Sequence, residues 1–460
     1  MTEKRVSLHG MWSSRLVFIL AATGSAVGLG NIWKFPYITG LNGGGAFVLV
    51  YLICIAIIGI PIMMAEVLLG RRGRRSPINT MMELAREAGS SPRWSWLGWV
   101  GVVAGILIMS YYSVIAGWAV AYVLDAADGA FVGFDGDSAG AHFGAMVSNP
   151  GTLAFWHAIF TILTVLVVAR GVRSGLEQAV KVLMPALFLL LALLMGYAVN
   201  TGYFADGLHF LFDPDFSKLT PEGVLTALGH AFFTLSLGMG AIMVYGSYMP
   251  KKTSISKTIF TVAIMDTLVA LMAGMVIFPI VFANGLQPAS GPGLVFVSLP
   301  IAFGEMSGGL LFGTLFFVLV VFAAWTSAIS LIEPAVAFLV ENRGMRRTTA
   351  AVLIGAFCWV LGLVTVMSFS SWSFSFEFAG ATKTDGMFDV LDILTSTFML
   401  PLGGMAIAIF AGWIMQRADT VDELGVGEGA GYRVWYTLVR YVSPFAVGIL
   451  ILNSLHLLPT

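Results

Sequence analysis

The chain has 460 residues, of which 58% are hydrophobic and only 11% are charged, and its mean hydropathy is +0.89. Soluble globular domains carry about 25% charged residues, so this composition excludes a soluble globular protein. The formal net charge of −1 gives no sign of a nucleic-acid partner. The composition therefore predicts a protein that uses the lipid bilayer as most of its solvent.

Long apolar runs follow one another along the whole chain. A membrane-spanning helix needs ~20 mainly apolar residues, and eleven runs are candidates: 12–37, 42–70, 96–124, 152–169, 176–199, 222–248, 257–283, 309–340, 348–369, 388–415 and 432–457. Short alternating strands, which are typical of a membrane β-barrel, do not accompany them. The predicted fold class is an all-α polytopic membrane protein.

Lysine and arginine are distributed unevenly between alternate connecting segments. If the N-terminus is cytoplasmic, all 24 Lys and Arg residues except Lys34, Lys218 and Lys383 fall on the cytoplasmic side. The positive-inside rule thus predicts a multi-pass protein of the cell membrane with a cytoplasmic N-terminus. With eleven spans, Thr460 would be extracellular. No A-x-A-like site closes a short apolar segment near the N-terminus, so we expect no cleavable signal peptide.

Two of the apolar runs are interrupted near their centres. The first contains three glycines, Gly24, Gly28 and Gly30, and the sixth contains the stretch FFTLSLGMGA at 232–241. Interrupted spans at matching places in two halves of opposite orientation are typical of an inverted-repeat transporter. Alternatively, the glycines only allow helices to pack closely. Close packing does not require the neighbouring Asn31, Thr234 and Ser236, so these polar residues favour the transporter.

Ionisable residues inside membrane spans are costly and are functional candidates; here they are Lys34, Glu66, His230, Asp266, Glu333, Asp389 and Asp392. Asp266 has no Lys or Arg within reach in its own run, so an alkali cation bound by oxygen ligands is a natural partner. A hydrogen bond to a neighbouring helix is the alternative. We interpret Glu66 and Glu333 first as structural anchors for unpaired backbone or hydroxyl groups.

Lys34 and Asp392 allow two interpretations. Either they close a vestibule as a pair, or Lys34 is an interfacial lysine that snorkels.

Other chemistries find little support in the sequence. Cys54 and Cys358 lie in separate runs and are expected to be buried apolar side chains without a disulfide or metal. The chain contains no GxxxxGKS/T loop, HExxH motif or Ser/His/Asp spacing, so no enzyme is expected. The residues alone indicate a cation-coupled carrier for a small solute.

Three groups of motifs resemble those of the neurotransmitter:sodium symporter family, which has the LeuT fold. They are GSAVGLGNIWKFPY followed by NGGGAF (42–47), FFTLSLGMGA, and TSAISLIEP (326–334). The resemblance extends from about Trp12 to Leu457 and is greatest to the bacterial branch that carries multiple hydrophobic amino acids. It implies one transporter domain over 1–460, with a 5+5 inverted repeat (12–199 and 222–415) and a peripheral span (432–457).

The resemblance also implies two sodium sites and no organic cofactor. The first site would use four residues together with the substrate carboxylate: Ala26, Asn31, Thr234 and Asp266. The second site would use carbonyls and hydroxyls of five residues: Gly24, Val27, Ala323, Thr326 and Ser327. Small hydroxyls and carbonyls make a rigid oxygen cage, and a carboxylate that completes one site would couple substrate binding to sodium binding.

By the same resemblance, ten residues would line an amino-acid pocket: Ala26, Leu29, Gly30, Ile108, Tyr112, Phe233, Ser236, Met239, Ser327 and Leu331. Some relatives carry a bulky aromatic residue at position 239, whereas methionine is flexible and polarizable. We therefore expect a roomy pocket for Leu-, Phe- or Trp-like side chains and no acidic ones. The alternatives are a small amine, imino acid or sulfonate as substrate, or a channel or sensor that does not concentrate its solute.

The chain departs from the family pattern at its ion sites and gates. Chloride-dependent members have a glutamine and a serine where this chain has His230 and Ala270, although Tyr51 is kept. Asp266 would supply the negative charge permanently, so we expect chloride independence. At the outer gate, Lys34 replaces the common arginine opposite Asp392 and loses its bidentate fork. The inner gate keeps Trp12, Tyr248 and Glu341, but its arginine position holds His9.

Overall fold

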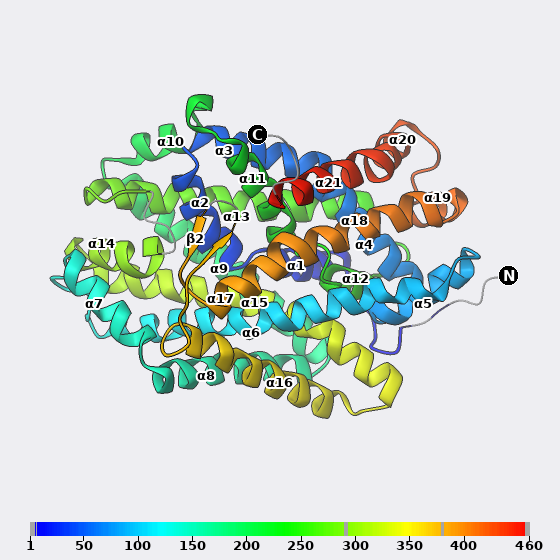
Figure 1. The fold of residues 1–460 in the computed structure, drawn as a ribbon, viewed down its shortest axis with the longest axis horizontal. Helices are drawn as coiled ribbons and strands as arrows, with labels where there is room; N and C mark the ends of the chain where they lie inside the picture. The colour runs from blue at the N-terminus through cyan, green and yellow to red at the C-terminus, as the bar shows by residue number, and fades with distance from the viewer. Residues whose placement is uncertain (1–4, 6, 289–292, 379–380, 456–460) are drawn as a thin grey trace.

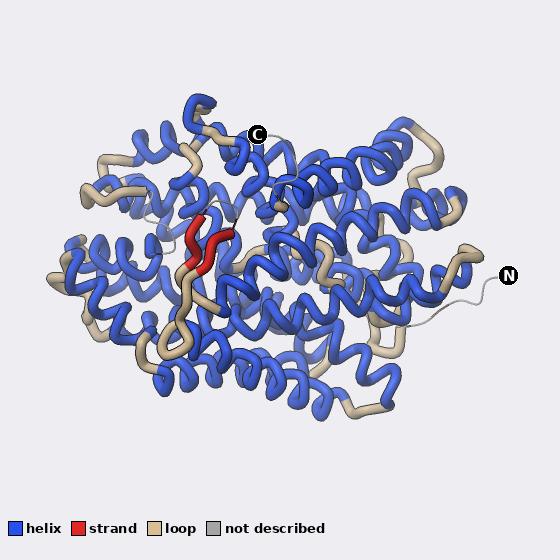
Figure 2. The backbone as a smooth tube through the Cα atoms, viewed as in Figure 1, coloured by secondary structure: helices blue, strands red, loops and turns tan. Residues whose placement is uncertain are grey.

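The computed structural model describes residues 5, 7–288, 293–378 and 381–455. Long helices lie side by side in one bundle and account for most of the chain (Figures 1 and 2). Residues 456–457 at the end of the run 432–457 and Thr460 lie outside the described residues, as does Lys4, one of the cations expected on the cytoplasmic side.

Nine helical segments of the described ranges are long and apolar enough to cross a membrane. They are Gly45–Gly73 (α3, Gly45–Cys54, and α4, Ile60–Gly73), Pro92–Ala127 (α6, Ser95–Ala127), Pro150–Ala169 (α8), Val172–Val199 (α9, Glu177–Val199), Ile255–Ala283 (α13), Gly309–Arg343 (α15), Arg347–Ser368 (α16), Met387–Ile414 (α17, Met387–Asp392, and α18, Leu400–Ile409) and Ala430–Ser454 (α20, Ala430–Thr437, and α21, Ser443–Ser454). Each overlaps one of the predicted runs, with ends that differ by a few residues.

The first predicted run is a broken helix. Its halves, α1 (Arg15–Ala26) and the segment Gly30–Leu41 (a π-helical turn, Gly30–Lys34, followed by α2, Phe35–Leu41), meet at 51°. Counting this pair as one span gives up to ten spans among the described residues. The interruption falls at the glycines, as the sequence predicts.

The sixth predicted run is also divided. Helix α11 (Pro221–Thr234) and helix α12 (Ala241–Ser247) are separated by Leu235–Gly240. Neither half reaches the length of a membrane span by itself, so the count of eleven spans stays a prediction. Within the separating segment, Ser236 adopts a left-handed φ of 54°, which is unfavourable for a residue with a side chain. Its hydroxyl donates a 2.8 Å hydrogen bond to the Ser25 carbonyl, which helps to hold that conformation.

Short helices collect at the two ends of the bundle (Figure 1). One end carries α7 (Gly136–Val147), α10 (Phe204–Phe212) and α14 (Leu299–Glu305), and the opposite end carries the N-terminus, α5 (Pro77–Glu87) and α19 (Arg417–Leu424). This separation is what alternating spans produce, and the assignment of one end to the cytoplasm stays a prediction. Strands β1 (Phe376–Phe378) and β2 (Ala381–Lys383) form a small antiparallel hairpin.

At the centre of the bundle α15 packs against both α6 and α1. The close approach of α6 to α15 depends on Gly105, because a Cβ there would lie 2.8 Å from the Leu331 carbonyl oxygen. Helix α6 carries Tyr112 and helix α15 carries Ser327, so this contact directs both side chains toward the break after α1.

The interiors of two spans contain buried carboxylates that anchor neighbouring groups. Glu66 Oε1 accepts a 2.5 Å hydrogen bond from the Gly238 N–H, and Glu333 accepts a 2.7 Å bond from the Tyr248 hydroxyl. Glu333 also pairs with Arg347. These contacts confirm the anchoring interpretation of both residues. Cys54 and Cys358 are buried and free, as expected.

Candidate substrate and ion site

The break in the first span leaves backbone groups that side chains satisfy. Helix α1 ends at Ala26 because Val27 turns into an extended conformation. The side-chain oxygen of Asn31 accepts a 3.0 Å bond from the Gly28 N–H, and the Tyr112 hydroxyl accepts a 3.0 Å bond from the Leu29 N–H. Buried N–H groups without partners are costly, so these two side chains stabilise the unwound segment.

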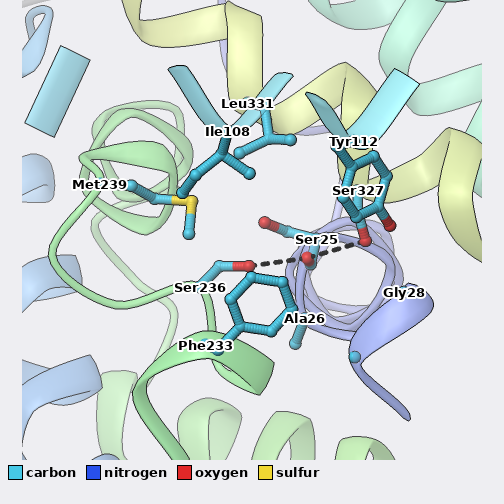
Figure 3. A pocket seen from close by; sticks show the side chains of 11 residues that line it. Ser25, Ala26, Gly28, Ile108, Tyr112, Phe233, Ser236, Met239, Ser327 and Leu331 are labelled. Atoms are coloured by element: carbon cyan, nitrogen blue, oxygen red, sulfur yellow. Dashed lines mark hydrogen bonds between the residues drawn. The ribbon is translucent and has the colours of Figure 1, made fainter. Parts of the chain in front are cut away.

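A small cavity lies between the two interrupted spans, α6 and α15 (Figure 3). Its lining residues are Ser25, Ala26, Gly28, Gly30, Ile108, Tyr112, Phe233, Ser236, Met239, Ser327 and Leu331. All residues predicted for the pocket line this cavity except Leu29, which is buried and contributes its backbone N–H to the bond with Tyr112. Ser25 and Gly28 line it in addition.

The cavity has a polar end and an apolar end. At the polar end the hydroxyls of Ser236 and Ser327 both donate to the Ser25 carbonyl, at 2.8 and 3.2 Å, as the dashed lines in Figure 3 mark. Ile108, Met239 and Leu331 lie together on the opposite side in Figure 3, with the Met239 sulfur toward the interior. This arrangement suits a solute with a charged group at one end and an apolar group at the other.

Three of the four residues predicted for the first cation site, Asn31, Thr234 and Asp266, contact one another, and the fourth, Ala26, is the last residue of α1. Asn31 Nδ2 donates to Asp266 Oδ1 at 2.8 Å, and the Thr234 hydroxyl donates to the same carboxylate at 3.2 Å. Asp266 is fully buried and has no ion pair with another described residue. Asp266 is thus hydrogen-bonded to neighbouring elements, which agrees with the alternative of a hydrogen bond to a neighbouring helix. No cationic side chain of the described residues pairs with it, which agrees with the alternative of a bound cation.

The residues predicted for the second cation site also meet, between α1 and α15. The Ser327 hydroxyl lies 3.3 Å from the Gly24 carbonyl oxygen and 3.0 Å from that of Val27. The Thr326 hydroxyl donates to the Ala323 carbonyl at 3.0 Å. Both sets consist entirely of carboxylate, amide, hydroxyl and carbonyl oxygens, which are the ligands of hard cations. The donor chemistry therefore fits sodium.

Two further contacts lie on either side of the cavity. Lys34 Nζ is 3.5 Å from Asp392 Oδ1 and 4.7 Å from the centre of the Phe233 ring, so the expected pair forms above a cavity-lining aromatic side chain. On the other side, Trp12 donates from its backbone to the Tyr248 carbonyl at 3.0 Å. His9 Nε2 lies 3.0 Å from Glu341 Oε1, so His9 contacts one of the residues predicted for the inner gate.

Where the resemblance predicts the chloride site, His230 and Tyr51 face one another with ring centres 5.4 Å apart. His230 is buried, and neither ring nitrogen has a hydrogen-bond partner among the described residues. Ala270 is also buried and supplies no polar atom. This pair therefore lacks the amide and hydroxyl donors of the chloride-dependent pattern.

The apolar spans, the two interrupted helices and the cavity between them define a membrane carrier. The chain matches the model of the Sodium:neurotransmitter symporter family over residues 9–131 and 140–459. It is 38% identical over 452 residues to the uncharacterized sodium-dependent transporter YhdH of Bacillus subtilis, covering 97% of this chain and 98% of that protein. An uncharacterized sodium-dependent transporter of Haemophilus influenzae is 32% identical over 451 residues, covering 96% and 98%.

The crystal structure of MhsT in complex with L-phenylalanine matches with a TM-score of 0.89 and 42% sequence identity, over 97% of this chain and 99% of that one. The chain therefore belongs to the sodium:neurotransmitter symporter family and has the LeuT fold. It is a sodium-dependent membrane transporter, and the family is one of transporters rather than enzymes.

The sequence reasoning missed two residues of the cavity, Ser25 and Gly28. Both lie inside the motif at 24–37, and the signal that marks Ser25 is a hydroxyl in an otherwise apolar run. Its hydroxyl donates a 2.7 Å bond to Ser330 on α15, while its carbonyl accepts the bonds from Ser236 and Ser327. Ser25 thus connects three elements around the cavity.

Proposed function

We propose that the protein carries hydrophobic and aromatic L-amino acids into the cell by sodium-coupled symport, independently of chloride. The observation that carries this proposal is a cavity whose polar end adjoins two sets of oxygen ligands and whose apolar end is formed by Ile108, Met239 and Leu331. The phenylalanine bound by MhsT, which is 42% identical, supports the substrate class.

In this proposal the substrate carboxylate lies beside the unwound segment between α1 and Gly30. The Tyr112 hydroxyl accepts a bond from the Leu29 N–H and keeps its own proton to donate to the carboxylate, and the N-terminal end of the helical half that begins at Gly30 favours an anion. The oxygens of Asn31, Thr234 and Asp266 and the Ala26 carbonyl would hold a sodium ion beside that carboxylate. Because the substrate carboxylate and the sodium ion would contact each other, binding of each would increase the affinity for the other.

The second sodium ion would be held between α1 and α15 by the carbonyls of Gly24, Val27 and Ala323 and by the hydroxyls of Thr326 and Ser327. Transport would proceed by alternating access within a 5+5 inverted repeat formed by 12–199 and 222–415, with 432–457 at the periphery. Lys34 and Asp392 would close the outer side. Trp12, Tyr248 and Glu341 would close the cytoplasmic side, where the N-terminus lies.

Uptake into proteoliposomes tests this function. With an inward sodium gradient, radiolabelled phenylalanine, leucine or tryptophan should accumulate above its external concentration, whereas an equal potassium gradient should give only equilibration. Equal uptake in both gradients would refute sodium coupling, and uptake that never exceeds equilibration would indicate a channel or sensor. The surface variant Thr314→Val serves as a control that should transport like the wild type.

A thermal-shift panel in sodium separates the substrate classes. Leucine, phenylalanine and tryptophan should stabilise the protein, and acidic amino acids should not, because the apolar end of the cavity offers no partner for a second carboxylate. Stabilisation by a small amine, an imino acid or a sulfonate alone would replace the proposed substrate class.

A further inference from the structure

The N-terminal segment before α1 contains a buried contact between histidine and a carboxylate. His9 Nε2 lies 3.0 Å from Glu341 Oε1, and the two side chains are 2% and 1% exposed. The imidazole also packs against the Tyr248 ring, with centres 5.7 Å apart. The contact lies beside α5, because the Ser76 N–H just before that helix donates to the same carboxylate.

Glu341 is held in place independently of His9. The Ser76 backbone N–H and hydroxyl each donate to the carboxylate at 2.8 Å, and Asn79 Nδ2 donates at 2.7 Å. Two groups thus face His9: the Glu341 carboxylate on α15 and the Tyr248 ring after α12. The loop before α5 and α5 itself contribute the neutral Ser76 and Asn79, which contact the carboxylate. Among the described residues, His9 is the one basic side chain paired with Glu341.

The same segment also crosses onto the second interrupted span. The Trp12 indole donates to the Tyr245 carbonyl at 3.1 Å, and its backbone donates to that of Tyr248 at 3.0 Å. The segment therefore joins α12 to α15 on one side of the cavity. Any opening of the cavity on that side that separates these two helices has to break either the Trp12 contacts or the contact between His9 and Glu341.

The charge of histidine, unlike that of arginine, changes between pH 5 and 8. We propose that His9 makes this contact a pH-sensitive latch: protonated His9 holds the N-terminal segment on Glu341, and neutral His9 releases it. A protonated imidazole forms a charge-assisted bond to a carboxylate away from water, whereas neutral imidazole donates an ordinary hydrogen bond. Because closure then binds a proton, closure is favoured as the pH falls and weakens as it rises.

Distances between spin labels measure the latch directly. Leu8 is 69% exposed and Thr348 is exposed at the start of α16, so Leu8→Cys and Thr348→Cys carry the labels in a background of Cys54→Ala and Cys358→Ala. Between about pH 5.5 and 8, the range in which histidine titrates, the population with the longer distance should rise at least about threefold. An unchanged distribution would overturn the proposal.

Two substitutions separate charge from packing at this position. His9→Arg should keep the short distance at both pH values, and His9→Gln should show the longer distance at both. The same pH response in His9→Arg as in the wild type would place the titrating group elsewhere and overturn the latch. His142 provides a matched control, because its Nε2 is also 3.0 Å from a carboxylate, that of Asp125, but both side chains are 32% exposed. His142→Gln should respond like the wild type.

The expected effect of pH on transport rests on the proposed function, whereas the distance measurement between the spin labels does not. If the N-terminal side is the inner side, lowering the internal pH of proteoliposomes from about 8 to 5.5 should slow the initial uptake of phenylalanine in the wild type more than in His9→Arg. A pH-dependent distance without uptake of any tested amino acid would retain the latch and reject the proposed substrate class.

Discussion

At the scale of single residues, position 28 decides whether the cavity can exist. A Cβ on Gly28 would lie 2.4 Å from the Ser327 hydroxyl and 2.7 Å from the Tyr112 hydroxyl. Both hydroxyls are fixed by other bonds: Ser327 to carbonyls of the unwound segment, and Tyr112 to the Leu29 N–H. Neither can move away without releasing a backbone partner, so only glycine fits.

Gly28→Ala should therefore weaken binding of phenylalanine and sodium together, by at least about tenfold, since a loss of about 1.4 kcal/mol already gives that factor. Sodium-dependent thermal stabilisation and equilibrium binding measure the effect. Gly196 in α9 is the matched control, because a Cβ there would meet nothing within 4 Å. If Gly28→Ala binds like Gly196→Ala, the cavity is not the binding site.

Met239 sets the shape of the apolar end of the cavity. Met239→Phe would place a rigid ring where a flexible thioether now lies, so it should reduce competition by tryptophan more than competition by alanine. Inhibition of labelled leucine uptake by each amino acid gives the selectivity order. Met146→Phe, in α7 outside the cavity, should leave that order unchanged, and an unchanged order in Met239→Phe would count against the placement of the substrate side chain.

At the scale of elements, a buried ion pair joins α4 to α19. Arg71 Nε lies 2.5 Å from Glu423 Oε1, and the side chains are 4% and 6% exposed. The same guanidinium donates to the backbone carbonyls of Thr253 and Glu423. One side chain at the end of the second predicted span thus links the loop before α13 to the helix that precedes the last span.

Removing one partner of a buried ion pair leaves a charge without compensation, which typically costs ~3–5 kcal/mol. Glu423→Ala should therefore lower the thermal stability of the protein in detergent clearly. Glu428→Ala should change stability little, because its pair with Arg417 is 62% and 47% exposed and exposed pairs contribute about 0–1 kcal/mol. Equal stability of the two variants would contradict the role assigned to Arg71.

At the scale of the whole molecule, the charges at the predicted sodium sites decide whether we expect transport to require chloride. We expect Asp266 to supply the negative charge at the first cation set, and the predicted chloride position holds His230 and Ala270 instead of an amide and a hydroxyl. Replacing chloride by gluconate on both sides of the membrane should leave sodium-driven uptake of phenylalanine unchanged within about twofold, well under the tenfold that corresponds to 1.4 kcal/mol. A collapse of uptake would show that chloride supplies a charge that Asp266 does not.

The sequence predicted the features that depend on local composition. Apolar length located the spans, and the glycines at 24, 28 and 30 located the break, because both follow from the cost of exposing backbone to lipid. The pattern of apolar residues could not predict contacts between residues that are distant in the chain. Position 9 was recognised only as a departure, whereas its distance to Glu341, 332 residues away, required the fold. Residues 294–305, between the seventh and eighth predicted runs, are likewise helical and pack Phe296 against Trp118.

The pair between Arg71 and Glu423 spans 352 residues of sequence, which has a consequence for how the chain is made. Because synthesis proceeds from the N-terminus, the segment that carries Arg71 enters the membrane long before its carboxylate exists. Until α19 emerges from the ribosome, that guanidinium has to stay in water or at the lipid surface, and the loop around it stays open. The carboxylate that completes this end of the bundle is therefore translated 352 residues after Arg71, so nascent chains that stop before Glu423 should be recognised by membrane quality control as unfinished.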